Sequence, residues 1–326
     1  MVELAIPPQR EQDSMLSNNA GKDEIDRQLP EGDEIFLDHV GHFVRDPKPA
    51  ADALARAGFA PTPLSVQVNP DGKGGEQLTG TGNICAMLPR GYVECLFKTA
   101  DTPLGHELDK AMERYPGVHL AAFAVHDPNA AHARLQAQGF RMRPLVSMQR
   151  PVMTETGREV AAFTVVRVER GEMAEGRMQM LRHRTEHAVW QPRWLAHPNG
   201  ALGLLDVVIK TEDAEEAAVR YARFLGRTAK RNAYGHYIQL DRGRVQLTSQ
   251  ETMRDLLPDA PDLPPPFICA YAIRVRSVEH LQRMLDDRRL AYMRRERAIM
   301  LPFPAQLGLG TWTFVEKPPD LPWRAS

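Results

Sequence analysis

The sequence predicts an α+β fold built from four repeated units, each with the order strand, helix, strand, strand, strand. Three features recur in step along the 326 residues. Each unit opens with an apolar run typical of a buried strand, continues with a helical pattern of constant length, and closes with a glycine that opens another strand. Internal repeats of this kind indicate the architecture more strongly than any single motif, because each copy constrains the interpretation of the others.

The opening strand and the helix define the first half of each unit. The opening strands are predicted at residues 36–44, 120–125, 204–209 and 268–275. In the first two units an alanine-rich helix pattern follows and ends in a Gly-Phe pair, at residues 46–59 and 127–140. The corresponding patterns of the third and fourth units begin at the helix-capping residues Asp213 and Ser277. Their apolar stripes predict helices that cover a sheet.

The second half of each unit is predicted to end in a hairpin. The glycines that open the last strands are Gly91, Gly176, Gly243 and Gly310. The hairpin of the first unit is the clearest, with strands at 84–88 and 92–97 on either side of a Pro-Arg-Gly turn. In the third unit a tight Asp-Arg-Gly turn at 241–243 separates two alternating runs, which is a good hairpin signal. The second strand of each unit is only weakly defined by its sequence.

Bulk composition is that of a soluble globular protein, with 43% hydrophobic and 25% charged residues. The net charge of −1 gives no electrostatic reason to expect nucleic acid or an anionic membrane as a partner. No apolar run approaches the ~18 residues that a membrane span needs, and the N-terminus lacks a secretory pattern. Three cysteines without a CxxC spacing fit a reducing compartment. We therefore expect a cytoplasmic protein.

The units group into two predicted domains. Residues 1–33 are polar without sustained periodicity, and we interpret them as a mobile tail. Turn-forming residues are concentrated at 191–203, between the second and third units. This places an N-terminal domain at residues 34–200 and a C-terminal domain at residues 201–326.

The chain resembles the vicinal oxygen chelate superfamily, which includes glyoxalase I, extradiol dioxygenases and bleomycin-resistance proteins, and it is most similar to the glyoxalase-like branch. The resemblance is carried by the order and spacing of four short strings: Leu37-Asp38-His39-Val40, Gly80-Thr81-Gly82-Asn83, Gly91-Tyr92-Val93-Glu94 and His197-Pro198-Asn199-Gly200-Ala201. It implies that the four βαβββ units pair into two half-open barrels, each curled around a divalent metal.

The same resemblance implies a site. The first and fourth strands of a unit are neighbours in such folds, which would bring His39 beside Glu94 inside the first barrel. An imidazole and a carboxylate suit Fe, Mn, Ni or Zn, and open coordination positions then accept two adjacent oxygens of a small-molecule substrate. Glu94, or water bound to the metal, is the expected proton acceptor. Isomerase, lyase and dioxygenase chemistry all remain open.

Aligning the units on their aspartates and glycines shows what replaces this pair elsewhere. The position of His39 is taken by Leu120, Asp206 and Ala270, and that of Glu94 by Gln179, Gln246 and Thr313. Gln179 is therefore the expected third and weaker ligand. We predict a metal in the N-terminal barrel, and a structural or pocket-wall role for the C-terminal one.

Two alternatives stay open. The leucine and threonine at ligand positions favour a metal-free binding or resistance-type protein that uses the same cup. One barrel could instead serve only as a dimer platform, which predicts a homodimer. Residues 183–187 spell the H-x-x-E-H motif of zinc peptidases, but they follow a strand pattern, so we interpret this match as a coincidence.

Overall fold

The structure is a computed structural model that describes residues 27–70, 75–257 and 263–324. The predicted tail therefore lies outside the described residues except for positions 27–33. That short segment is packed against the first sheet, since Gln28 is buried and its amide donates to the carbonyl of Pro89 at 2.6 Å. No helix in the described ranges is long and apolar enough to cross a membrane.

The four predicted units are present in the predicted order. The first consists of β1 (Ile35–Phe43), α2 (Pro47–Arg56), β2 (Ser65–Pro70), β3 (Glu76–Met87) and β4 (Tyr92–Lys98). The second consists of β5 (Gly117–Val125), α4 (Pro128–Ala137), β6 (Val146–Thr154), β7 (Gly157–Arg167) and β8 (Arg177–His183). The third consists of β9 (Ala201–Lys210), α6 (Ala214–Leu225), β10 (Ala229–Asn232), β11 (Gly235–Gln239) and β12 (Arg244–Thr248). The fourth consists of β13 (Phe267–Val275), α8 (Val278–Asp287), β14 (Met293–Arg295), β15 (Ala298–Pro302) and β16 (Thr311–Val315).

Four helical elements connect the units: α3 (Pro103–Arg114), α5 (Glu186–Val189), η1 (Pro192–Trp194) and α7 (Gln250–Leu256). The 3-10 turn η2 (Ala305–Leu307) lies between β15 and β16, and η3 (Pro318–Asp320) follows β16. The predicted helix starts are confirmed, because the side chains of Asp46, Asp127, Asp213 and Ser277 each accept a backbone N–H of the first turn.

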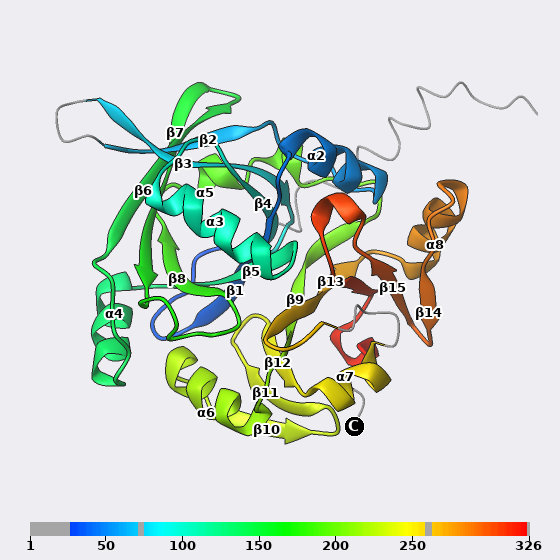
Figure 1. Ribbon diagram of the computed structural model, residues 1–326. Helices are drawn as coiled ribbons and strands as arrows, with labels where there is room; N and C mark the ends of the chain where they lie inside the picture. The colour runs from blue at the N-terminus through cyan, green and yellow to red at the C-terminus, as the bar shows by residue number, and fades with distance from the viewer. Residues whose placement is uncertain (1–26, 71–74, 258–262, 325–326) are drawn as a thin grey trace, which may run out of the picture.

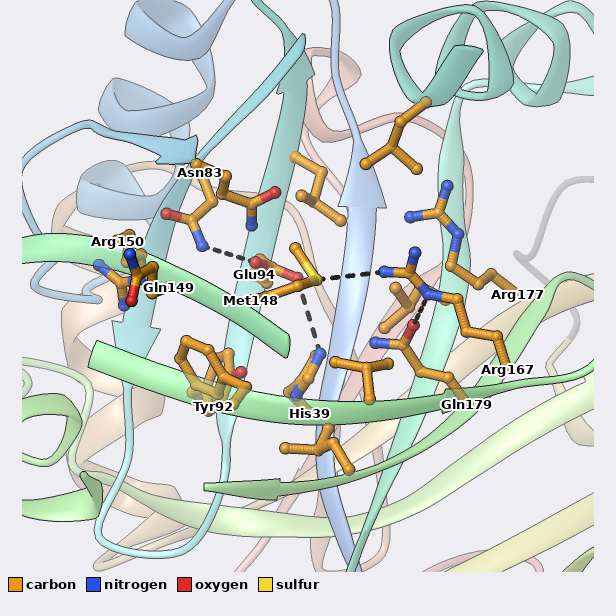
Figure 2. A pocket seen from close by; sticks show the side chains of 17 residues that line it. His39, Asn83, Tyr92, Glu94, Met148, Gln149, Arg150, Arg167, Arg177 and Gln179 are labelled. Atoms are coloured by element: carbon orange, nitrogen blue, oxygen red, sulfur yellow. Dashed lines mark hydrogen bonds and ion pairs between the residues drawn. The ribbon is translucent and has the colours of Figure 1, made fainter. Parts of the chain in front are cut away.

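The sixteen strands of the described ranges form two eight-stranded sheets, and the α+β fold class is confirmed. Figure 1 shows how the two sheets are arranged. The first sheet differs from a half-open cup because it closes into a barrel with the order β1-β4-β3-β2-β6-β7-β8-β5. Closure depends on the pairing of Val68 in β2 with Gln149 in β6. The closed barrel encloses a cavity, seen in Figure 2. In the second sheet the outer strands β10 and β14 have only four and three residues, and this sheet stays open.

One local arrangement recurs in all four units. The first strand pairs in parallel with the fourth, and it carries a bulge, so that one residue drops out of the ladder to the neighbouring unit. The bulged residues are Asp38, His119, Leu205 and Cys269. The repeated glycine sits against this bulge, and a β-carbon at Gly91 would lie 2.5 Å from the carbonyl oxygen of Asp38. Only glycine allows that approach, which explains why the glycine recurs.

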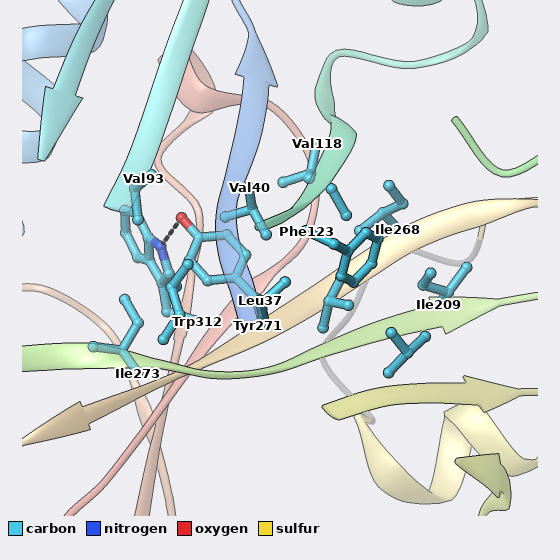
Figure 3. Close-up of a cluster of buried hydrophobic side chains, with 14 of the residues drawn as sticks. Leu37, Val40, Val93, Val118, Phe123, Ile209, Ile268, Tyr271, Ile273 and Trp312 are labelled. Atoms are coloured by element: carbon cyan, nitrogen blue, oxygen red, sulfur yellow. Dashed lines mark hydrogen bonds between the residues drawn. The ribbon is translucent and has the colours of Figure 1, made fainter. Parts of the chain in front are cut away.

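The apolar core lies where the two sheets meet. Figure 3 shows Val40 and Val93 of the first sheet facing Tyr271 and Trp312 of the second. His42 is buried in the same region, where one ring nitrogen contacts the carbonyl of Leu307 and the other the hydroxyl of Tyr271, each at 2.8 Å. Burial of large apolar side chains contributes about 1.5–3 kcal/mol each, so this contact holds the two sheets together.

The buried His42 predicts that the protein loses stability in acid. Desolvation by burial lowers its pKa to about 4, whereas the unfolded chain has a value near 6.5. Between those values the unfolded state binds a proton that the folded state does not, so stability falls as pH drops from 6.5 toward 4. At pH 5 the loss from this residue is roughly 2 kcal/mol, since one pH unit is worth ~1.4 kcal/mol. Urea unfolding of the wild type and His42→Gln at pH 7 and pH 5 measures it. Equal pH dependence in both proteins would contradict the assignment.

Candidate functional site

The interior of the first barrel contains a small cavity with a free volume of about 50 Å³, room for a few water molecules. Figure 2 shows His39 from β1, Glu94 from β4 and Gln179 from β8 on its wall. The three residues predicted as ligands therefore line one cavity. Apolar side chains from the same strands complete the wall: Leu96, Leu120, Phe163, Val165 and Leu181.

The structure brings His39 and Glu94 together. The parallel pairing of β1 with β4 sets Gly41 opposite Glu94, so His39 lies two residues away on the same face. Their Nε2 and Oε2 atoms are 3.6 Å apart, which is too long for a hydrogen bond. Both side chains are buried, with 4% and 5% of their surface exposed. Two polar atoms thus face each other across a short gap that a third group can bridge.

The alignment of the units is confirmed by the strand registers. Gln179, Gln246 and Thr313 pair with Ala122, Val208 and Ala272, each two residues beyond the position equivalent to His39. Leu120 occupies the position of His39 in the second unit and lines the same cavity.

A buried carboxylate orients His39. Asp38 is fully buried, and its two oxygens accept from His39 Nδ1 at 2.6 Å and from His183 Nε2 at 2.9 Å. Burial acts to raise the pKa of Asp38, but the two imidazoles outweigh it and hold that pKa well below its usual range. An ionised Asp38 accepts a hydrogen bond from the Nδ1–H of His39, which leaves a lone pair on Nε2 toward Glu94.

The sequence did not reveal that Asp38 and His183 belong to the site. A bulge leaves Asp38 out of the β1–β5 ladder, and His183 is the last residue of β8, 145 positions away. In the H-x-x-E-H run, by contrast, His187 is exposed and contacts Glu159 at 2.9 Å. Its two histidines bind different carboxylates, which supports the interpretation of that motif as a coincidence.

Glu94 is held from its other side. Its Oε1 accepts from the amide of Asn83 at 2.6 Å, across the β3–β4 hairpin. The ring of Tyr92 stacks on His39 with centroids 4.4 Å apart. Both members of the pair therefore have fixed orientations, and the atoms left free are His39 Nε2 and Glu94 Oε2.

Gln179 is engaged differently. Its Oε1 accepts from Arg167 Nε at 3.2 Å, so the oxygen that would bind a metal faces a cation. No group of three or more His, Cys, Asp or Glu side chains in the described ranges is arranged to hold a metal. His39 and Glu94 still offer a divalent metal one nitrogen and one oxygen, each with an orienting partner, whereas Gln179 fits poorly as a third ligand.

The second cup is filled by the end of the chain. Asp206, at the position equivalent to His39, accepts from Trp323 Nε1 at 2.7 Å and from Arg324 Nε at 3.1 Å. Asn232 links Gln246 to the carbonyl of Trp323. Trp323 and Arg324 thus form an internal plug, in agreement with a structural role for this sheet.

Two other histidines lie outside the cavity and make structural contacts. His119 points away from the cavity and contacts the carbonyl of Tyr115. His197 acts as a structural clamp, since its ring bridges the N–H of Ala60 and the carbonyl of Met87. The cysteines are buried and free.

Comparison with known proteins gives one family match. The model of the glyoxalase-like domain matches residues 37–225, more than half of the chain. No curated protein matches the sequence.

Solved structures with a similar fold share little sequence. A hypothetical protein from Staphylococcus aureus is 9% identical with a TM-score of 0.58, covering 86% of this chain and 98% of that one. A mutant of 4-hydroxymandelate synthase from Streptomyces coelicolor is 13% identical with a TM-score of 0.54, covering 86% and 92%. A xylose isomerase-like TIM barrel/4-hydroxyphenylpyruvate dioxygenase fusion protein is 10% identical with a TM-score of 0.51, covering 90% and 50%. At these identities the likeness shows the fold alone.

The Asp38 network predicts the effect of Asp38→Asn. An asparagine oxygen can accept from only one imidazole, and its NH₂ group then opposes the other, so the orientation of His39 or His183 is lost. We expect a destabilisation of about 1–3 kcal/mol. We also expect the Nδ1–H signal of His39 to change in ¹⁵N-detected NMR. Asp52→Asn, on the exposed face of α2, is the control and leaves both readouts unchanged.

The plug predicts a stability loss in Trp323→Ala. The indole is fully buried, so its removal leaves a cavity and takes away one of the two donors to Asp206 Oδ2, and we expect a loss of about 3–5 kcal/mol. Denaturant unfolding measures it, with the partly buried Trp194→Ala for comparison. A loss no larger than that of Trp194→Ala would show that the chain end does not anchor the second sheet.

Proposed function

Because this chain belongs to the glyoxalase-like domain family, within the vicinal oxygen chelate superfamily, we propose that its N-terminal barrel is the active site of an enzyme. Its substrate is a small molecule with two adjacent oxygens, and the reaction is an isomerisation, a lyase reaction or a dioxygenation. The observation that carries the proposal is the pair of free atoms, His39 Nε2 and Glu94 Oε2, that face each other at 3.6 Å inside a small cavity.

A divalent metal such as Fe, Mn, Ni or Zn, held by His39 and Glu94, would polarise the substrate oxygens and stabilise negative charge on them. The protein residues have separate tasks. Asp38 keeps the His39 lone pair directed into the cavity, and Asn83 fixes Glu94 so that Oε2 stays available. Glu94 accepts the proton that leaves the substrate. His39 and Glu94 are both buried, and a low-dielectric environment strengthens each of these electrostatic interactions.

A metal-free binding protein is the second candidate, and a specific observation favours it. The side-chain oxygen of Gln179 already accepts a hydrogen bond from Arg167, and the second-unit equivalent of His39 is Leu120, which cannot bind a metal. The protein therefore supplies two good metal ligands, where tight binding needs a third. In that case the same barrel binds its small molecule through hydrogen bonds that the ligand donates to His39 Nε2 and Glu94 Oε2.

Metal analysis separates the two candidates. Protein purified without chelator or affinity tag is expected to carry close to one metal per chain by elemental analysis. His39→Ala is expected to lose it, and Glu94→Gln is expected to bind Zn²⁺ at least tenfold more weakly in calorimetry. His187→Ala, an exposed histidine outside the cavity, is the matched control. A wild type that binds no Zn²⁺, or a His39→Ala variant that binds it normally, would overturn the enzyme proposal in favour of the binder.

A further inference from the structure

The cavity of the N-terminal barrel has an excess of positive charge. Four charged side chains line it, namely Glu94, Arg150, Arg167 and Arg177, so three guanidinium groups accompany one carboxylate. The whole chain has a net charge of −1, and the excess is therefore local. Figure 2 shows Arg167 and Arg177 on one side of Glu94 and Arg150 on the other.

Two of these arginines, Arg150 and Arg167, have no acidic partner in the described part of the chain. Arg177 donates to Glu107 at 3.2 Å, and Glu107 is shared with Arg143 and Arg170. Among the described residues, the hydrogen-bond partners of Arg167 are the amide oxygen of Gln179 and, at 3.4 Å, the sulfur of Met148. Neither partner is charged, and no carboxylate of the described ranges lies within 4.0 Å of Arg150 or Arg167.

Such an arrangement is costly without an anion. A partly buried charge is normally paired, and burial together with the neighbouring charge of Arg177 lowers the pKa of Arg167 to about 9. A neutral side chain could contact Gln179 and Met148 equally well. A guanidinium adds a planar pair of donors that matches a carboxylate.

The surroundings of Arg167 also favour negative ligands. Arg167 and Arg177 lie between the cavity and an outer pocket of about 340 Å³ at the end of the barrel. The outer pocket has six basic residues against two acidic ones: Lys110, Arg114, Arg143, Arg167, Arg170 and Arg177 against Glu107 and Glu169. A concave surface lined by charges of one sign raises the local concentration of ions of opposite charge.

We infer that the N-terminal barrel takes a small carboxylic acid, of the 2-oxo or 2-hydroxy type, whose carboxylate binds Arg167. The carboxylate supplies the negative charge that the cavity lacks. Its 2-oxygen points toward the gap between His39 and Glu94, and this orientation rests on the proposed function. The anion contact itself depends only on the arginine.

Binding of pyruvate, glycolate and oxalate, measured by calorimetry on metal-free protein, tests the inference. At least one of these acids is expected to bind, and to bind at least tenfold more tightly than its neutral amide. Arg167→Gln is expected to weaken that binding at least tenfold, with a smaller loss in Arg167→Lys, which keeps the charge but loses the paired donors. Arg141→Gln, an exposed arginine outside both pockets, is the matched control and binds normally.

The outcomes are distinct from those of the metal experiment. Acid binding that requires Arg167 but persists in His39→Ala supports the inference even if no metal binds. Metal binding at His39 combined with equal acid affinity in the wild type and Arg167→Gln overturns the inference alone. Equal affinity of the wild type for the acids and for their neutral amides also overturns the inference. Thermal unfolding of Arg167→Lys checks that this variant is folded.

Discussion

The parallel contact between the first and fourth strands of each unit is the constraint on which the rest of the structure depends. In all four units the first strand has a bulge, at Asp38, His119, Leu205 or Cys269, and a glycine at the start of the fourth strand packs against it. The register that follows is identical in each unit. It places two side chains, one from each strand, on the same face of the sheet and directs both into the cup.

The paired positions on the first and fourth strands have different roles in the two sheets. In the first, the paired positions hold His39 and Glu94, and the bulged residue is an aspartate that binds the histidine. In the second, the equivalent of His39 is Asp206, which the chain's own Trp323 and Arg324 satisfy. The first barrel thus directs His39 Nε2 and Glu94 Oε2 into its cavity, whereas the carboxylate of Asp206 in the second sheet is hydrogen-bonded within the protein.

Much of this could be predicted from the sequence, because spacing along a strand determines the face on which a side chain lies. The repeated aspartates and glycines are sufficient to align the units, and the resemblance to the vicinal oxygen chelate superfamily implies the strand pairing that brings His39 beside Glu94. The contribution of His183 could not be predicted, since it depends on a side-chain contact with Asp38 across 145 positions of sequence. Arg167 lies on a strand of partly exposed residues, and only the closure of the barrel turns its side chain into part of a cavity. The chain-end plug is likewise a tertiary contact with no local signal.

The central claim is that His39 Nε2 and Glu94 Oε2 form one functional centre. A crystal structure of the protein soaked with Zn²⁺, with anomalous data at the zinc edge, tests it most directly. We expect an anomalous peak about 2.0–2.2 Å from both atoms, inside the first barrel. A peak at other residues only, or density that shows the two side chains turned away from each other, would contradict it.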